Sequence, residues 1–131
     1  MAALSLLWAV SCSNSAAMNE STANVKHVAQ ADFADEVTRA SGPVVVEFYA
    51  TYCGSCRVLA PMLDKAAEPL AGKIKFFKVN IDESPGLAQN FQIEGTPTVL
   101  LFKDGKLTER IAGLPTEAEL RTKLEALAAM K

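Results

Sequence analysis

Hydrophobic residues along the chain follow two different periods. Mostly apolar runs predict β-strands at residues 44–49, 74–81 and 98–103, and strands with more polar residues are predicted at 25–28 and, after a turn signal, at 107–112. Between these runs, apolar residues recur every three or four positions, which predicts helices over residues 31–40, after Cys56, from Ser84 and after Thr116. The predicted order of elements is therefore βαβαβα followed by ββα.

The longest helical pattern follows the second of two neighbouring cysteines. Its apolar face comprises Val58, Leu59, Met62, Leu63, Ala66 and Leu70. Pro61 lies inside this pattern and predicts a kink, and Gly72 predicts the end of the helix. In the helix over residues 31–40 we expect Asp32 to be the N-cap, and in the helix that opens with Ser84-Pro85 we expect Ser84 in that role.

Two local motifs complete the prediction of the fold. Asp104-Gly105, between two apolar runs, is typical of a hairpin turn, and Thr116-Glu117-Ala118-Glu119 is typical of a capping box. Parallel strands joined by helical crossovers, with a hairpin that closes the sheet, predict an α/β fold of three layers, α/β/α, around a central mixed sheet.

Size and charge restrict the function classes. The 131 residues suffice for one domain, which we place at residues 24–131. The net charge of −2 offers no basic excess to neutralise phosphates, which argues against nucleic acid as a partner. Three cysteines are too few for a disulfide framework, and Cys12 lies far from the other two in sequence.

Residues 1–23 have a different character. The stretch from Met1 to Asn19 has no charged side chain, and its apolar run is too short to span a bilayer. The run resembles the apolar region of a secretory signal peptide, and Ala9-Val10-Ser11-Cys12 resembles a bacterial lipoprotein cleavage box. On this hypothesis Cys12 carries the lipid, and a polar tether links it to the domain. No Lys or Arg precedes the run, and Ala9 stands where Leu is usual, so a disordered N-terminal tail stays an open alternative.

Two cysteines lie three positions apart between a predicted strand and a predicted helix, in the segment Tyr52-Cys53-Gly54-Ser55-Cys56. Such a turn is suited to dithiol–disulfide chemistry. The rival interpretation is half of a zinc site. Structural zinc takes four ligands, and the domain offers only these two cysteines and His27, so we expect no metal.

Several segments at matching spacing resemble the thioredoxin family over residues 25–131. They are the segment from Phe48 to Arg57, Pro61, Lys78-Val79-Asn80-Ile81-Asp82, Gly95-Thr96-Pro97-Thr98, Phe102-Lys103-Asp104-Gly105-Lys106 and Gly113. Three positions depart from the family. Tyr52 replaces the usual Trp, Ser55 replaces the usual Pro between the cysteines, and Glu47 replaces the usual buried Asp.

The resemblance implies roles for the two cysteines and for two charged residues near them. Cys53, at the helix start, would attack a substrate disulfide as a thiolate stabilised by the helix dipole, and Cys56 would resolve the mixed disulfide. Glu47 would be buried and carry a proton to or from Cys56, the alternative being a surface glutamate at a strand edge. Lys78 would be the cation near Glu47, or else an ordinary exposed lysine.

The resemblance also implies a substrate surface. Pro97 is expected to be cis, which would leave the backbone of Thr96 free to pair with an extended substrate, the alternative being a trans turn proline. Tyr52, Gly54, Thr96 and Gly113 would form a flat apolar rim. Ser55 is expected to tune the reduction potential, with a lean towards a reductant.

The expected activity is thiol–disulfide exchange that reduces protein disulfides, with the Cys53–Cys56 disulfide as redox centre and no other cofactor. The resemblance implies a monomer recharged by an upstream dithiol donor. That donor would be a membrane dithiol transporter outside the cytoplasm, where residues 1–23 would direct and lipid-anchor the protein, or a thioredoxin reductase if the protein is cytoplasmic. A non-catalytic binding module with the same fold is the alternative from another class.

Overall fold

A five-stranded sheet forms the centre of the molecule, in a computed structural model that describes residues 23–131. The strands lie in the order β1-β3-β2-β4-β5. Their bounds are β1 Lys26–His27, β2 Pro43–Tyr49, β3 Lys75–Asn80, β4 Thr98–Lys103 and β5 Lys106–Ala112. The first three strands are parallel to one another, and β4 and β5 form an antiparallel hairpin at one edge.

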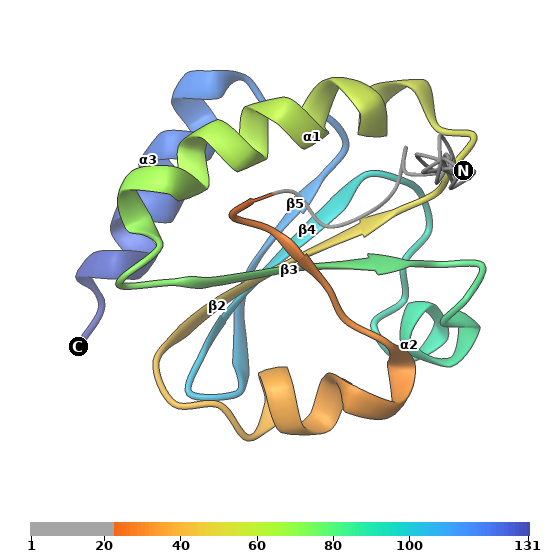
Figure 1. Ribbon diagram of the computed structural model, residues 1–131, viewed down its shortest axis with the longest axis horizontal. Helices are drawn as coiled ribbons and strands as arrows, with labels where there is room; N and C mark the ends of the chain where they lie inside the picture. Colours follow the sequence, from red (N-terminus) through yellow and green to blue (C-terminus); the bar gives the residue numbers. More distant parts are fainter. Residues whose placement is uncertain (1–22) are drawn as a thin grey trace, which may run out of the picture.

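Helices cover both faces of this sheet (Figure 1). The helices α1 (Gly54–Ala67) and α3 (Glu117–Ala129) lie on one face. A 3₁₀ turn η1 (Gln30–Asp32), a π-helical segment η2 (Ala34–Thr38) and the short helix α2 (Pro85–Asn90) lie on the other. The predicted α/β/α layers, mixed sheet and element order are confirmed.

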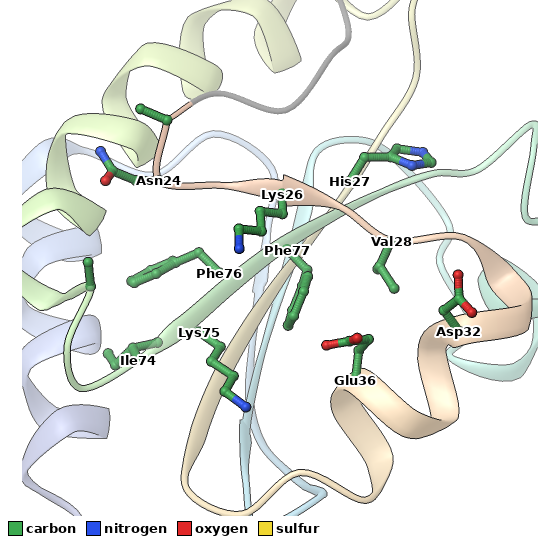
Figure 2. A pocket seen from close by; sticks show the side chains of 12 residues that line it. Asn24, Lys26, His27, Val28, Asp32, Glu36, Ile74, Lys75, Phe76 and Phe77 are labelled. Atoms are coloured by element: carbon green, nitrogen blue, oxygen red, sulfur yellow. The ribbon is translucent and has the colours of Figure 1, made fainter.

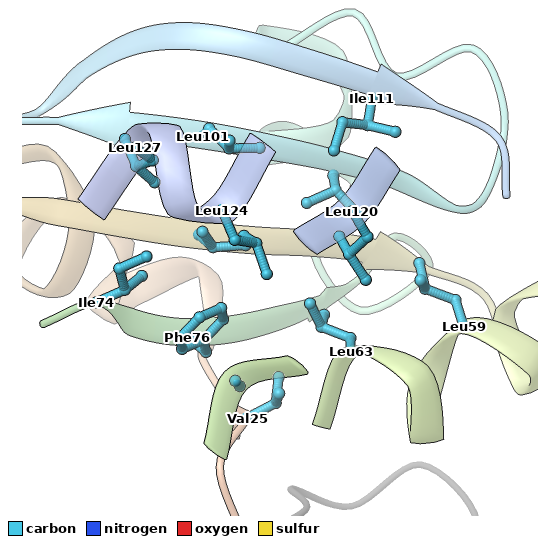
Figure 3. Close-up of a cluster of buried hydrophobic side chains, with 13 residues drawn as sticks. Val25, Leu59, Leu63, Ile74, Phe76, Leu101, Ile111, Leu120, Leu124 and Leu127 are labelled. Carbon is cyan, nitrogen blue, oxygen red and sulfur yellow. The ribbon is translucent and has the colours of Figure 1, made fainter. Parts of the chain in front are cut away.

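The sheet divides the apolar core into two clusters because successive side chains of a strand point to opposite faces. In β2, Val45 packs with α1 and α3, whereas Val44, Val46 and Phe48 pack on the opposite side. Figure 3 shows the first cluster, in which leucines of α1 and α3 gather against side chains of the sheet such as Phe76 of β3 and Leu101 of β4. The central strand β2 therefore contributes side chains to both clusters, and the segment with the two cysteines follows it directly.

The first helical segment begins earlier than the sequence predicts. Its 3₁₀ turn starts at Gln30 after Ala29, so Asp32 lies inside the first turn and its N–H donates to the Ala29 carbonyl at 3.1 Å. The expectation that Asp32 is the N-cap is therefore wrong. Phe33 and Val37, four residues apart, are buried in the second cluster as their spacing predicts.

Two expectations for the long helix are also wrong. The α-helix ends at Ala67 and a 3₁₀ turn, Glu68–Leu70, replaces its expected last turn before Gly72. Pro69 explains the change, because proline lacks an N–H and its ring clashes with the carbonyl four residues earlier. Val58 lies outside the apolar face and is 52% exposed. Pro61 lies inside α1, and the kink expected there stays a prediction.

The shorter elements begin largely as expected. The capping box at Thr116 is confirmed, with the Glu119 N–H donating to Thr116 Oγ1 at 3.1 Å and the Thr116 N–H donating to the Glu119 carboxylate at 2.9 Å. Ser84 occupies the N-cap position of α2, but its side chain makes no capping bond and is buried instead. Within residues 23–131, no helix has both the length and the apolar character needed to cross a membrane.

The β4–β5 hairpin turn is joined to the first helical segment. Asp104 and Gly105 have φ of 51° and 77°, the backbone that an Asp-Gly hairpin turn requires. The Gly42 N–H donates to Asp104 Oδ1 at 2.7 Å, and the Asp104 N–H donates to the Gly42 carbonyl at 3.1 Å. A Cβ atom on Gly105 would collide with the Thr38 carbonyl oxygen. The turn is therefore packed against other backbone.

Candidate active site

The two cysteines lie where central strand β2 passes into α1. Cys53 is the N-cap residue of α1, and its Sγ accepts a hydrogen bond from the Cys56 N–H at 3.2 Å. The two cysteines are joined by a disulfide. Cys56 is 5% exposed, whereas Cys53 is half-buried. Cys53 is therefore the sulfur of the pair that an incoming protein can reach more easily.

The loop before β4 lies against Cys53. Its Thr96–Pro97 peptide bond is cis, which confirms that expectation. The Thr96 carbonyl oxygen lies 3.4 Å from Cys53 Sγ, and the Gly113 N–H donates to the Pro97 carbonyl at 2.9 Å. Thr96, Pro97 and Gly113 also line one open cavity of about 180 Å³. The structure thus brings the ends of β4 and β5 to the dithiol.

The expected rim residues lie at or near the surface. Tyr52 is 70% exposed and Gly54 is exposed on the other side of Cys53 in the chain. Arg110 lines the cavity that Thr96 shares with Gly113, and its guanidinium donates to the Phe91 carbonyl at 2.6 Å. No local motif marks Arg110 in the sequence, because only the pairing of β5 with β4 brings it there.

Glu47 is buried behind the dithiol, with 3% of its surface exposed. The alternative of a surface glutamate is thereby excluded. Glu47 and Cys56 line the same small cavity of about 30 Å³, which has room for roughly one water molecule. Burial raises the pKa of Glu47 to about 7, although the Lys78 charge acts in the opposite direction. A carboxyl that exchanges its proton near neutral pH therefore lies beside the buried cysteine.

Lys78 is paired with Glu47 across β2 and β3. It is 6% exposed, which excludes the alternative of an ordinary surface lysine. Its Nζ lies 5.2 Å from the centroid of the Tyr49 ring, and Tyr49 lines the cavity of Glu47 as well as packing in the core. Burial lowers the pKa of Lys78, and the Glu47 charge opposes that shift. The sequence predicts only that Tyr49 ends a strand, since strand alternation cannot show a cavity.

Replacement of Lys78 by methionine is expected to raise the pKa of Glu47 above its value of about 7, because the cation that favours the carboxylate is removed while burial remains. Methionine preserves most of the aliphatic volume. Carbon-13 NMR of the Glu47 side chain against pH measures the effect. A midpoint that stays the same or falls would contradict the electrostatic role of Lys78.

The remaining predicted residues lie elsewhere. His27, in β1, has its Nε2 3.3 Å from a carboxylate oxygen of Glu83, and it lines a different cavity from Cys56. Cys12 lies outside the described residues. A groove of about 500 Å³ beside β1 is lined by side chains of both signs, among them Lys26, Lys75 and Glu36 (Figure 2). Within residues 23–131, no three His, Cys, Asp or Glu side chains gather in a group that could hold a metal.

Comparison with known proteins agrees with this geometry. The family model described as Thioredoxin matches residues 24–126. The thioredoxin of Pseudomonas aeruginosa is 37% identical over 103 residues, which cover 79% of this chain and 95% of that protein. The chain belongs to the thioredoxin family.

Other thioredoxins show similar identity. The thioredoxin of Mycobacterium tuberculosis is 40% identical over 106 residues, which cover 81% of this chain and 90% of the relative. The M-type chloroplastic thioredoxin of Pisum sativum is also 40% identical over 106 residues, but these cover only 62% of the pea protein. The predicted thioredoxin fold is therefore confirmed.

Family membership and the Cys53–Cys56 pair together define the activity. The protein is a thiol–disulfide oxidoreductase and, as a thioredoxin, a protein-disulfide reductase whose active site is the Cys-x-x-Cys segment. Protein disulfides are its class of substrate, and its oxidised form requires a reductant. The expected class of activity is confirmed.

Proposed function

We propose that Cys53 is the attacking thiolate and Cys56 the resolving thiol in the reduction of protein disulfides. The observation that carries this assignment is the difference in burial, since Cys53 is half-buried and Cys56 is 5% exposed. Cys53 forms a mixed disulfide and displaces one substrate sulfur as a thiolate. Cys56 then attacks Cys53 Sγ, closes the internal disulfide and releases the second substrate sulfur, so two electrons pass to the substrate.

Glu47 is proposed to carry the proton for Cys56. The cavity that the two share and the pKa of about 7 support this role, because a group that titrates near the working pH can both accept and donate a proton. Lys78 would limit the rise of that pKa.

The substrate is proposed to lie along Thr96 as an added strand. The Thr96 carbonyl lies beside Cys53 Sγ, and the adjoining cavity reaches Gly113. Exposed Tyr52 and Gly54 would complete the rim and cover the substrate cysteine from the other side.

Insulin reduction tests the proposal. With dithiothreitol as the electron donor, the wild-type protein should accelerate the precipitation of insulin chains well above the donor alone. A protein in which both active-site cysteines are shown to be reduced, and which still gives no acceleration, would contradict a disulfide reductase.

The site of action is proposed to lie outside the cytoplasm, with Cys12 as a lipid anchor and a membrane dithiol transporter as the upstream donor. The apolar run before Ala9-Val10-Ser11-Cys12 supports this location. If the protein were cytoplasmic, a soluble reductase driven by NADPH would reduce the Cys53–Cys56 disulfide instead.

Expression in a bacterial host with radioactive palmitate tests the anchor. The full chain is expected to incorporate label into the membrane fraction, and Cys12→Ala is expected to lose it because the acyl acceptor is gone. Cys12→Ala should keep full reductase activity, since Cys12 does not belong to the dithiol. Equal labelling of both proteins, or none in the wild type, would contradict the anchor.

A further inference from the structure

Three polar atoms surround the sulfur of Cys53. The Cys56 N–H lies at 3.2 Å, the Ser55 Oγ at 3.5 Å and the Thr96 carbonyl oxygen at 3.4 Å. Two of these groups can donate a hydrogen bond to a sulfur anion, whereas the carbonyl can only accept one from a neutral thiol. The Ser55 hydroxyl is thus the side-chain donor placed at the reacting sulfur.

The Ser55 hydroxyl lies against the Cys53 sulfur. Ser55 is the second residue of α1, directly after Gly54, and is half-buried. Within residues 23–131, Cys53 Sγ is the partner that its Oγ contacts. A hydroxyl held in this way can rotate its hydrogen towards the sulfur when the sulfur becomes charged, and hydrogen bonds to charged acceptors are roughly twice as strong as neutral ones.

We propose that Ser55 is a catalytic residue whose hydroxyl donates a hydrogen bond to the Cys53 thiolate. The proposal rests on the assignment of Cys53 as nucleophile. Ser55 transfers neither an electron nor a proton in the reaction, since the Cys53–substrate bond forms as the substrate disulfide breaks, and the pair of electrons leaves with the substrate sulfur. Its effect is to stabilise the reduced protein in its thiolate form.

The thiolate affects both directions of exchange. When the oxidised protein is recharged, the thiolate of an upstream reductant attacks the Cys53–Cys56 disulfide. Each hydrogen bond donated to Cys53 Sγ stabilises the thiolate and so favours the reduced protein. Loss of the Ser55 hydroxyl should therefore make Cys53 ionise at higher pH and make the protein a stronger reductant.

Ionisation of Cys53 is best measured in the full-length Cys12→Ala, Cys56→Ser background, where Cys53 is the only thiol of the three cysteines. Thiolate absorbance at 240 nm is followed against pH. Ser55→Ala is expected to raise the midpoint by about half a unit to one unit, a threefold to tenfold smaller ionisation constant. Ser55→Thr, which restores a hydroxyl, should return the midpoint to that of the background protein.

A midpoint that is the same with Ser55 and with Ser55→Ala would overturn the proposal, as would a Thr variant that behaves like the Ala variant. Circular dichroism of each variant confirms that it is folded. Arg57, which donates to the Thr51 carbonyl at 3.3 Å, and Glu47 are unchanged in all of these proteins, so neither charge accounts for a difference.

Equilibration with glutathione gives a second readout in the otherwise wild-type chain. Ser55→Ala should shift the equilibrium towards the oxidised protein threefold to tenfold, and an unshifted equilibrium would also overturn the proposal. Insulin reduction stays a separate test. A wild type without reductase activity would refute the proposed function while leaving the ionisation result intact.

Discussion

Replacement of Cys53 by serine is expected to reduce the rate of insulin reduction to that of dithiothreitol alone. A serine hydroxyl is not ionised near neutral pH and cannot form a disulfide, so no mixed disulfide arises. The buried Cys56 cannot take over, because it is 5% exposed and a bulky protein disulfide does not reach it. Turbidity at constant donor concentration measures the rate.

The matched variant Cys56→Ser separates the two roles. It keeps the attacking thiolate but lacks the resolving thiol, so it should stop as a mixed disulfide with its substrate at one turnover. Non-reducing electrophoresis with a disulfide-containing substrate would show this product with Cys56→Ser and not with Cys53→Ser. Trapping by Cys53→Ser instead would reverse the assignment of nucleophile and resolver.

Glu47→Gln is expected to make the stability of the folded protein less dependent on pH. The pKa of Glu47 is about 7 in the folded protein against 4.5 for an ordinary glutamate. Between these values the folded protein retains a proton that the unfolded chain has released. The free energy of unfolding therefore falls as pH rises through this window, and the stability contribution of the neutral Glu47 is present below pH 4.5 and lost above pH 7.

The size of the effect follows from the same shift. Each unit of pKa is worth roughly 1.4 kcal/mol, so wild type should lose about 3 kcal/mol more than Glu47→Gln between the two ends of the window. Urea unfolding below pH 4.5 and above pH 7 measures it. The titratable groups other than Lys78, whose pKa responds to the Glu47 charge, have the same surroundings in both proteins, so their contributions cancel in the comparison. Parallel pH profiles for the two proteins would show that Glu47 ionises like an exposed glutamate.

Most of the architecture could be predicted because it depends on local patterns. Strand β4 begins and ends at the predicted residues, Thr98 and Lys103, since its apolar run is bounded by turn residues. The capping box and the Asp-Gly turn each need only a few neighbouring residues. The dithiol was predicted from its place between a central strand and a helix, and the family resemblance implied the cis bond at Pro97.

The errors arise where the burial of a side chain depends on distant parts of the chain. Val58 fits the apolar spacing of α1 but is exposed to solvent. The spacing of apolar residues does not show how far the core extends along and around the start of a helix. Ser84 is at the expected cap position, yet its side chain is buried and makes no capping hydrogen bond. The burial of Glu47 and Lys78 follows from the place of β2 and β3 inside a sheet that is covered on both faces, and the residue pattern of a single strand does not reveal that place.

The hairpin turn at Asp104 and Gly105 limits where this protein can be labelled. β4 is antiparallel to β2 and its last residue pairs with Pro43, so the turn lies at the end of the sheet away from Cys53. That distance from the chemistry would recommend it for a peptide tag or a fluorophore, since turn tips usually tolerate insertions. Here the turn is hydrogen-bonded to Gly42 and packed on Thr38, so an insertion would separate the C-terminal hairpin from the N-terminal half of the domain. Lys131, which is exposed after α3, is the better place to attach a probe.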